Sequence, residues 1–357
     1  MRQGTAVVAA RPRRPRLRYL MGLSVLMGGA LVAQPTAPNL TVALGKGAPR
    51  ASGEFDVLTY NVKGMPWPLA QGRPAALGAI AGRLARMRAE RRQPQVVLLQ
   101  EAFTPEAKAI GRLAGYRYVV EGAYVRGAPG DGEMAGRSWR LGETVPAMLD
   151  SGLIVLSDYP VRRVSRAAFP AAACAGYDCL AAKGVLVVEL ELPGGRTLAV
   201  ATTHFNSRGA SAAPRSRTAD AYARQSRFLA DYLARVRESG MPLVLAGDFN
   251  RGDRPARIAM LSRALGTLGG HDAPRDALTQ SVANDASGHV RSRDAAWIRK
   301  RGRDLQYALD GETLKVRPVG VQIPFGTEPD GTMLSDHMGY TVRYRIAPRM
   351  PGRAPTT

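Results

Sequence analysis

Five short segments carry carboxylate, amide and imidazole side chains at points where an apolar run ends. They are Asn61, Glu101, Thr203-His204, Gly247-Asp248-Phe249-Asn250 and Ser335-Asp336-His337. The chain has only 4 histidines, and two of them fall in these segments. Hydrolysis of a phosphodiester near neutral pH needs a hard cation on the phosphoryl oxygens, an activated water and help for the departing alkoxide. Together the segments supply side chains for that chemistry.

Glu101 and Asn61 are the first candidates for a metal site. Glu101 follows the run Val96-Val97-Leu98-Leu99-Gln100, and Asn61 follows another apolar run. Because Mg²⁺ retains several waters, one or two carboxylates and an amide suffice to hold it. Asp336 is the third candidate ligand, although each of these residues alone is also typical of a strand-end turn. We expect one or two Mg²⁺ ions, which Mn²⁺ or Co²⁺ could replace.

The remaining segments offer groups that hold water and move protons. Gly247 permits a close backbone approach, while Asp248 and Asn250 can hold an attacking water and a phosphoryl oxygen. A simple Asp/Asn turn is the alternative. His204 and His337 are candidates for proton transfer because imidazole titrates near neutrality, and structural histidines are the alternative. The other two histidines, His271 and His289, lie in irregular sequence and receive no role.

Size and composition indicate one large globular domain. The chain has 357 residues, of which 45% are apolar and 22% charged, and its net charge is +21. No repeat of about 20 to 50 residues is visible. Excess positive charge attracts phosphate-bearing polymers or anionic membranes, but it does not choose between them.

Residues 1–33 have the features of an export signal. An arginine-rich stretch without acidic residues precedes an apolar run from Tyr19 to Ala33, as in secretory signals. An uncleaved anchor is the alternative. We expect a linker over 34–53, a catalytic domain over 54–346 and a disordered tail over 347–357. No later run is long and apolar enough to span a bilayer, so we expect an exported protein, periplasmic or secreted, that is soluble or peripheral to the membrane.

Both cysteines lie close together, at Cys174 and Cys179. In an exported chain this spacing favours a disulfide that closes a small loop. Two free thiols are the alternative.

The periodicity of the chain mixes strand and helix patterns. Strands are predicted at 55–60, 96–99, 152–156, 184–192, 197–203, 242–246, 305–309 and 339–344. Helices are predicted at 74–91, 105–113 and 218–238. Several strands are nearly continuous apolar runs, as in strands buried on both faces. This order indicates two packed sheets flanked by helices.

Two stretches lack a regular pattern. Residues 122–143 are rich in glycine and charge and include Trp139, and residues 269–303 are polar and include Trp297. We predict long surface loops near the substrate, because long loops in compact domains are often functional. Disordered insertions are the alternative.

In their order along residues 55–344, the five segments resemble the endonuclease/exonuclease/phosphatase superfamily. The resemblance implies a single-domain, four-layer α/β sandwich, in which helices flank two packed mixed β-sheets, and a Mg²⁺-dependent phosphodiesterase or phosphatase. It implies Mg²⁺ on Glu101 and Asn61 and a general base at His337. By the same resemblance, Asp248 and Asn250 hold the water and a phosphoryl oxygen. His204 would stabilise the pentacovalent state or assist the leaving group.

The segment 174–184, with the sequence CAGYDCLAAKG, resembles a loop of the neutral and bacterial sphingomyelinases. In that loop an aspartate lies five residues before a Lys-Gly that opens a strand. The resemblance implies that Lys183 faces the phosphate and that Asp178 sets the position of the loop. Lys183 would then supply positive charge to a phosphoryl oxygen or a leaving group. A surface lysine with a solvated Asp178 is the alternative.

The sequence departs from the superfamily pattern in two places. Superfamily members often have Leu-Asp-Tyr before their last strands, and that aspartate orients the base histidine; here the stretch is Leu305-Gln306-Tyr307. Gln306 can accept a hydrogen bond but cannot stabilise an imidazolium as a carboxylate would. We therefore expect a weakened partner for His337. The milder departure is Phe205-Asn206 after His204, where sphingomyelinases commonly show Leu-Gln.

These features predict a Mg²⁺-dependent phosphodiesterase that releases a phosphorylated headgroup from a sphingolipid or related phospholipid. Its partner would be a phospholipid at a membrane surface, contacted through Trp139 or Trp297 and nearby arginines, and no protein partner is implied. A secreted deoxyribonuclease-like nuclease acting on nucleic acid is the alternative, which the net charge favours. A catalytically impaired phosphoester-binding protein is a second alternative, suggested by Gln306.

Overall fold

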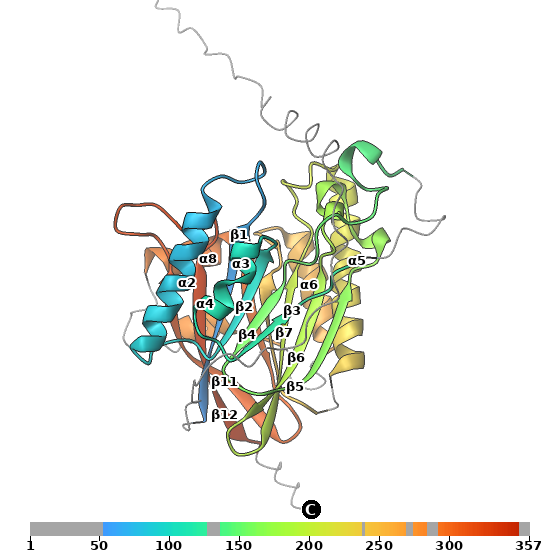
Figure 1. Cartoon of the computed structure of the whole chain (residues 1–357). Helices are drawn as coiled ribbons and strands as arrows, with labels where there is room; N and C mark the ends of the chain where they lie inside the picture. Colours follow the sequence, from blue (N-terminus) through green and yellow to red (C-terminus); the bar gives the residue numbers. More distant parts are fainter. Residues whose placement is uncertain (1–52, 127–135, 238–239, 269–273, 284–291, 350–357) are drawn as a thin grey trace, which may run out of the picture.

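The structure is a computed structural model that describes residues 53–126, 136–237, 240–268, 274–283 and 292–349. Two six-stranded sheets pack face to face, and helices cover their outer faces (Figure 1). The predicted four-layer α/β sandwich is therefore confirmed. The expected signal at 1–33, almost all of the expected linker, and His271 and His289 lie outside the described residues.

The first sheet has the strand order β11-β12-β1-β2-β4-β3. Its central pair, β1 and β2, is parallel, and its other pairs are antiparallel. The sheet is therefore mixed, as expected. The strands are β1 (Glu54–Gly64), β2 (Val96–Ala102), β3 (Tyr118–Glu121), β4 (Ile154–Ser157), β11 (Leu314–Phe325) and β12 (Gly339–Pro348).

The second sheet has the order β5-β6-β7-β8-β10-β9, with β7 and β8 as its parallel pair. The two glycines of the β6–β7 hairpin, Gly194 and Gly195, both have positive φ, as the predicted tight turn requires. The strands are β5 (Val161–Ala168), β6 (Gly184–Leu192), β7 (Arg196–His204), β8 (Leu243–Asp248), β9 (Arg275–Asp276) and β10 (Asp304–Leu309).

Helices form the outer layers and the edges. The longer ones are α2 (Arg73–Ala89), α5 (Arg215–Val236), α6 (Pro255–Gly266), α7 (Ala277–Ala283) and α8 (Arg293–Arg301). The short ones are α3 (Pro105–Lys108), α4 (Ile110–Leu113), and the 3₁₀ turns η3 (Trp139–Leu141), η4 (Ala171–Ala173) and η5 (Gly176–Leu180). None of the helices in the described part of the chain combines the length and the apolarity needed to cross a membrane.

Three apolar clusters hold the layers together. One lies between the sheets and includes Val57 and Val188. A second joins the second sheet to α5 and α6, and a third joins the first sheet to α2 and α4. Neighbouring residues Val57 and Leu58 of β1 belong to different clusters. Both faces of β1 are therefore buried, as its continuous apolar run predicted.

Strand register brings the ends of distant segments together. In the parallel β7–β8 pair, His204 lies beside Asp248, and in the antiparallel β10–β8 pair, Asp304 lies beside the same Asp248. On the facing sheet, Asn61 of β1 lies beside Gln100 of β2. One end of the sandwich therefore collects the residues that the sequence singled out.

Some predicted elements differ in the structure. The stretch 269–303 is not a loop throughout, because its described residues include α7 and α8. The helix expected at 105–113 is divided at Ala109 into α3 and α4. Strand β11 was missed because prolines occur within it, and proline cannot donate to a β-ladder. Strand β12 runs to Pro348, so the first two residues of the expected tail belong to it.

Candidate active site

His337 and Asp304 form a buried pair at the centre of the site. The Nδ1 atom of His337 lies 2.9 and 2.8 Å from the two carboxylate oxygens of Asp304. The other ring nitrogen, Nε2, lies 3.8 Å from Oδ2 of Asp248. Because Asp304 accepts the Nδ1 proton, Nε2 is the nitrogen left to exchange a proton with a substrate or water.

The carboxylates around His337 set its protonation. Burial alone disfavours the imidazolium, but the charges of Asp304 and Asp248 outweigh it and raise the pKa of His337 to about 9. Burial also opposes ionisation of Asp248, yet the neighbouring histidines lower the pKa of that carboxyl to about 2. With the charge of Asp248 compensated by a cation, His337 would titrate closer to neutrality, as a base on water requires.

The expectation that Gln306 leaves His337 with a weakened partner is wrong, because Asp304 is its partner. The side-chain amide of Gln306 donates to the backbone oxygens of Val57 and Tyr340, each at 3.2 Å, and its oxygen accepts from the hydroxyl of Tyr344. Gln306 is thus a buried structural residue between the sheets. His337 has a carboxylate partner after all, and the orienting acid lies two residues before the position at which the sequence pattern placed it.

Glu101, Asn61 and Asp248 form the acidic side of the site. The Nδ2 atom of Asn61 donates to Glu101 at 3.0 Å and to Asp248 at 3.1 Å, so one amide ties two carboxylates together. Oδ1 of Asn61 accepts from the backbone NH of Lys63. Asn61 therefore meets the carboxylates with its nitrogen, as a residue that positions them.

Glu101 combines burial with backbone strain. Its φ is 54°, in the left-handed region that non-glycine residues rarely adopt. Its side chain remains 21% exposed, which leaves access for water. Burial raises the pKa of the Glu101 carboxyl, against the hydrogen bond from Asn61 and the charge of Lys183. Strained backbone of this kind concentrates at functional sites.

The donor set fits a hard divalent cation. Ligand atoms of Glu101, His204 and Asp248 lie within 4.8 Å of one another, and so do those of Asp248, Asp304 and His337. Two carboxylates held together in a buried site repel each other unless a positive charge compensates them. Carboxylate oxygens with access to water are the ligands that Mg²⁺ prefers. Glu101 and Asp248 are therefore the carboxylates that would hold the ion, and the amide of the predicted ligand Asn61 lies between them.

Asp336 lies apart from these carboxylates. Its side chain is 53% exposed and pairs with Lys63 at 3.5 Å, and it belongs to neither group of potential ligands found among the described residues. The structure therefore does not bring Asp336 into the cluster with Glu101. Its neighbour Ser335 has a positioning role, because its hydroxyl donates to the backbone oxygen of Asn61 at 2.7 Å.

His204 and Lys183 form the basic side of the site. The Nζ atom of Lys183 lies 3.1 Å from Nε2 of His204, which lies 3.5 Å from Asp248. Burial, followed by the charge of Lys183, lowers the pKa of His204 well below its ordinary value. His204 is therefore neutral, and Lys183 is the cation that faces the carboxylates. Among the described residues, Nδ1 of the buried His204 has no hydrogen-bond partner.

Asp178 fixes Lys183 in this place. One carboxylate oxygen of Asp178 accepts from Nζ of Lys183, and the other accepts from the backbone NH of Ser207 at 2.7 Å. Lys183 is 7% exposed, so it is not the surface lysine that was the alternative. Asp178 and Lys183 thus both hydrogen-bond the backbone of the loop that follows His204 and hold it in place.

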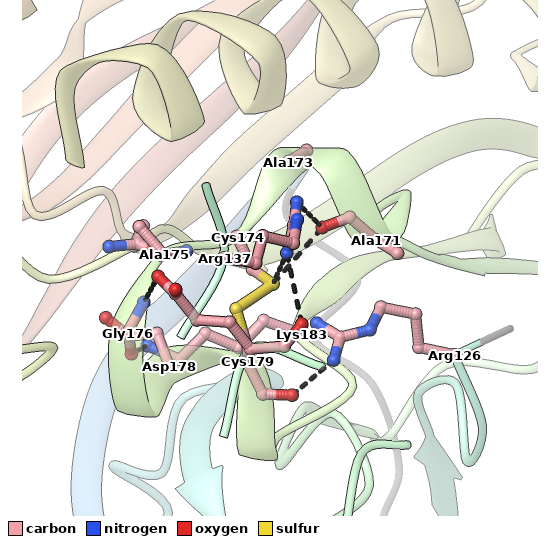
Figure 2. The surroundings of a disulfide bond; sticks show 12 residues. Arg126, Arg137, Ala171, Ala173, Cys174, Ala175, Gly176, Asp178, Cys179 and Lys183 are labelled. Atoms are coloured by element: carbon pink, nitrogen blue, oxygen red, sulfur yellow. Dashed lines mark hydrogen bonds and ion pairs between the residues drawn. A yellow bond between two sulfur atoms is a disulfide. The ribbon is translucent and has the colours of Figure 1, made fainter. Parts of the chain in front are cut away.

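The disulfide between Cys174 and Cys179 closes the loop that carries Asp178 (Figure 2). The predicted pairing is therefore present. Two arginines approach this loop: Arg126 donates to the backbone oxygen of Cys179, and Arg137 donates to that of Ala171. The backbone of the loop is thus held on both sides of the disulfide.

Glu143 is a buried anchor that the sequence analysis missed. Its Oε1 accepts from the backbone NH of Gly176 at 2.7 Å, and its Oε2 accepts from Ser138 and from Arg217 of α5. It therefore joins the disulfide loop to α5. The residue stands in a glycine-rich stretch without periodicity, so only its acidic type could have marked it.

Asn250 and Gly247 shape the end of β8. Nδ2 of Asn250 donates to the backbone oxygen of Phe205 at 3.0 Å, and its backbone NH donates to Asp248 at 2.9 Å. Asn250 has a φ of 45°, the left-handed conformation that asparagine tolerates. A Cβ on Gly247 would lie 2.2 Å from the backbone oxygen of Thr203, so only glycine permits this approach of β8 to β7.

Comparison with protein families shows which family the chain belongs to. The model of the endonuclease/exonuclease/phosphatase family matches residues 58–337. The chain belongs to the endonuclease/exonuclease/phosphatase family. Every segment of the site, from Asn61 to His337, falls within the matched range.

A sphingomyelinase of Mycobacterium tuberculosis is 27% identical over 211 residues, which cover 56% of this chain and 34% of the relative. The match thus spans about a third of the length of that protein. Sphingomyelinase C from Streptomyces griseocarneus has the same fold, with a TM-score of 0.51 and 22% identity, covering 81% of this chain and 99% of that one. A Staphylococcus aureus beta toxin variant with bound magnesium ions is also similar, with a TM-score of 0.51 and 16% identity over 81% of this chain and 99% of that one.

The arrangement contains the groups that hydrolysis of a phosphoester needs. His337, oriented by Asp304, can take a proton from water; Asp248 lies 3.8 Å from its Nε2, and the backbone NH of Asn250 donates to Asp248. On the opposite side, Lys183 can stabilise negative charge on a phosphoryl or departing oxygen. A cation on Glu101 and Asp248 would supply further charge neutralisation.

Proposed function

We propose that the protein is a Mg²⁺-dependent phosphodiesterase that hydrolyses phospholipids at the headgroup, with cleavage of the phospholipase C type as in sphingomyelinases. Water would attack the phosphorus, the bond to the lipid alcohol would break, and the phosphorylated headgroup would be released. The observation that carries the proposal is the placement of Lys183. Its ammonium is held by Asp178 against His204, and the resemblance to the sphingomyelinase loop implies that this lysine faces the phosphate.

The charges give each side of the site a separate task. On one side Asp304 and His337 would activate water, and on the other Lys183 would stabilise the departing oxygen. The related beta toxin variant has bound magnesium ions, which supports Mg²⁺ as the cation on Glu101 and Asp248. Mn²⁺ or Co²⁺ would be substitutes, and one or two ions would bind.

Contact with a lipid surface would occur at the end of the sandwich that carries the site. The segment after β1 and the turn η3 both project from this end (Figure 1). They contain Trp67 and Trp139, whose exposed fractions are 73% and 65%. Trp297 instead packs against the core between the sheets, so of the two tryptophans first considered, Trp139 suits an interfacial contact. Export to an oxidising compartment would agree with the disulfide.

The two alternatives differ in their support. A secreted nuclease acting on nucleic acid is favoured by the net charge of +21. An impaired binding protein loses its main argument, because Asp304 supplies the carboxylate that Gln306 was thought to replace.

The test is phosphocholine release from sphingomyelin vesicles by the purified protein, with Mg²⁺ or with EDTA, beside degradation of plasmid DNA in the same buffer. We expect Mg²⁺-dependent lipid cleavage without loss of DNA. Loss of DNA alone would assign the protein to the nucleases. Inactivity on both, with intact folding and bound Mg²⁺, would contradict the proposal.

A further inference from the structure

A basic groove opens beside the site. Its volume is about 730 Å³, and its wall includes Asn250, whose backbone is tied to Asp248. The other walls come from the loop after β7, the loop after β8 and helix α8. Eight basic residues line the groove, and Asp253 is the acidic residue among its lining; the basic ones are Arg208, Arg215, Arg251, Arg254, Arg257, Lys300, Arg301 and Arg303.

Most of these cations lack a carboxylate partner. Within the described ranges, Arg254 pairs with Asp253 at 3.3 Å, whereas Arg208, Lys300 and Arg303 have no carboxylate oxygen within 4.0 Å. Arg257 and Arg301 donate to backbone oxygens instead. The groove therefore concentrates positive charge, most of which has no direct carboxylate partner among the described residues.

Concentrated charge of one sign raises the free energy of the protein unless a ligand compensates it. Burial is the main cause that lowers the pKa of the Arg301 guanidinium, and the charge of Arg303 adds to it. An anion between the walls would offset the repulsion among these positive charges. Arginine and lysine are also the side chains that bind phosphate through charge-assisted hydrogen bonds.

The groove adjoins the position of the reacting phosphate. Arg303 immediately precedes Asp304, the partner of His337, and its backbone oxygen accepts from Phe249 at 2.8 Å. Asn250 belongs both to the site and to the groove. A group attached to the reacting phosphate through a short linker would therefore enter the basic groove.

The chemistry of the walls selects among such groups. A choline cation would be repelled by the arginines. Stacked nucleobases need open aromatic faces, but the ring of Trp297 is covered by Arg301, whose guanidinium carbon lies 4.3 Å from the ring centroid. A volume of about 730 Å³ suits a compact small-molecule group.

We propose that this basic groove is a phosphate subsite, which binds a second phosphate group carried by the headgroup of the phospholipid substrate. The inference rests on the proposed lipid activity and narrows it to headgroups of the phosphoinositide type, which carry phosphates beyond the one that is cleaved. Zwitterionic sphingomyelin would then be the poorer substrate.

The experiment compares three substrates at fixed Mg²⁺. They are phosphatidylcholine vesicles containing phosphatidylinositol bisphosphate, the same vesicles containing sphingomyelin, and the soluble diester bis-p-nitrophenyl phosphate, which lacks a second phosphate. The variant Arg208→Gln with Lys300→Gln removes one charge from each of two walls. Its matched control is Arg86→Gln with Arg92→Gln, which removes two charges from a separate basic hollow beside α2.

We expect the wild type to prefer the bisphosphate lipid. The groove variant should lose about tenfold in kcat/KM on that lipid and keep its rate on the soluble diester, while the control variant keeps both. Inositol trisphosphate should inhibit the wild type more strongly than inorganic phosphate does, and this difference should shrink in the groove variant.

Three results would overturn the inference. Equal rates on sphingomyelin and the bisphosphate lipid, unaffected by the groove variant, would leave the lipid activity standing without the phosphate subsite. Stronger inhibition by a single-stranded oligonucleotide than by inositol trisphosphate, lost in the groove variant, would assign the groove to nucleic acid. Hydrolysis of the soluble diester with no lipid cleaved would remove the proposed function and this inference together.

Discussion

Asp304 lies beside Asp248 across the β8–β10 ladder, and its carboxylate holds Nδ1 of His337 at 2.8 Å. The strands are antiparallel, so the first residue of β10 stands next to the last residue of β8. This arrangement gives the imidazole a defined tautomer, in which Nδ1 carries the proton and Nε2 faces Asp248. Asp304 is thus a positioning residue for the proposed base.

Replacement of Asp304 by Asn should lower kcat by about 10² to 10⁴-fold, because an amide cannot hold the same tautomer or stabilise the imidazolium. KM should change little, since Asp304 does not meet the substrate. Steady-state kinetics on bis-p-nitrophenyl phosphate would measure both. Gln306→Leu is the matched control, and it should lower stability while keeping kcat within a few-fold of wild type. If Gln306→Leu lowered kcat more than the Asp304 replacement does, Gln306 would be the residue that orients His337.

The His337–Asp304 pair predicts a pH dependence of stability in EDTA. The folded-state pKa of His337 is raised to about 9 from an ordinary value of 6.5, so the folded protein binds this proton more tightly than the unfolded chain does. The resulting stabilisation is present below pH 6.5 and is lost as the pH rises through 9. It amounts to about 3 kcal/mol.

Urea unfolding between pH 6 and 10 would measure this dependence, with His337→Gln as the comparison. We expect the free energy of unfolding of the wild type to fall across this range by more than that of the variant. If the free energy of unfolding changed equally with pH in both proteins, the pKa of His337 would not be raised in the folded state.

Metal binding should depend on Glu101 and not on Asp336. Glu101→Gln removes the charge at constant size, and we expect it to weaken Mg²⁺ binding by on the order of 100-fold and to abolish turnover. Asp336→Asn should leave the affinity unchanged, because that side chain is 53% exposed and pairs with Lys63. Isothermal titration calorimetry with Mg²⁺ would compare the variants. A loss of affinity in Asp336→Asn would restore Asp336 as a ligand.

The sequence predicted most residues of the site, including Lys183 and His337, which lie just before strands, but it missed Asp304. Glu101, His204 and Asp248 come at the ends of apolar runs, and parallel pairing within each sheet brings such ends to the same edge. Asp304 comes before its apolar run. Its place in the site depends on the antiparallel register with β8, which a local pattern does not reveal.

The same limit applies to the fold. The buried strands of both sheets were recognisable because their residues are apolar on both faces. Strand β5 was missed because its exposed edge contains Arg162 and Arg163, and α8 was missed because charged residues surround its few apolar ones. Edge strands and polar helices are stabilised by neighbours distant in the chain, and single-sequence periodicity does not include those contacts.

Lys183 should matter for chemistry more than for folding. Lys183→Met keeps the length of the side chain and removes its charge, so we expect kcat on sphingomyelin to fall by about 10²-fold. Lys108→Met is the matched control, because Lys108 is also paired with carboxylates, Glu121 and Asp150, but away from His204. Kinetics and thermal unfolding of both variants would separate the two effects. A wild-type rate in Lys183→Met would remove the main support for a sphingomyelinase-like reaction.

Substitution of Gly247 tests how closely β7, which carries His204, and β8, which carries Asp248, must approach each other. A Cβ at this position would lie 2.2 Å from the backbone oxygen of Thr203, so Gly247→Ala must push β8 away from β7. We expect a loss of about 1–3 kcal/mol in the free energy of unfolding, together with a loss of activity beyond what the remaining folded fraction explains. Gly78→Ala is the matched control, because Gly78 lies within α2 and has no neighbouring atom within 4 Å of the added Cβ. That variant should be more stable than wild type by about 0.5–1 kcal/mol and equally active. If Gly247→Ala kept both stability and activity, the distance between His204 and Asp248 would not be set by the approach of these two strands.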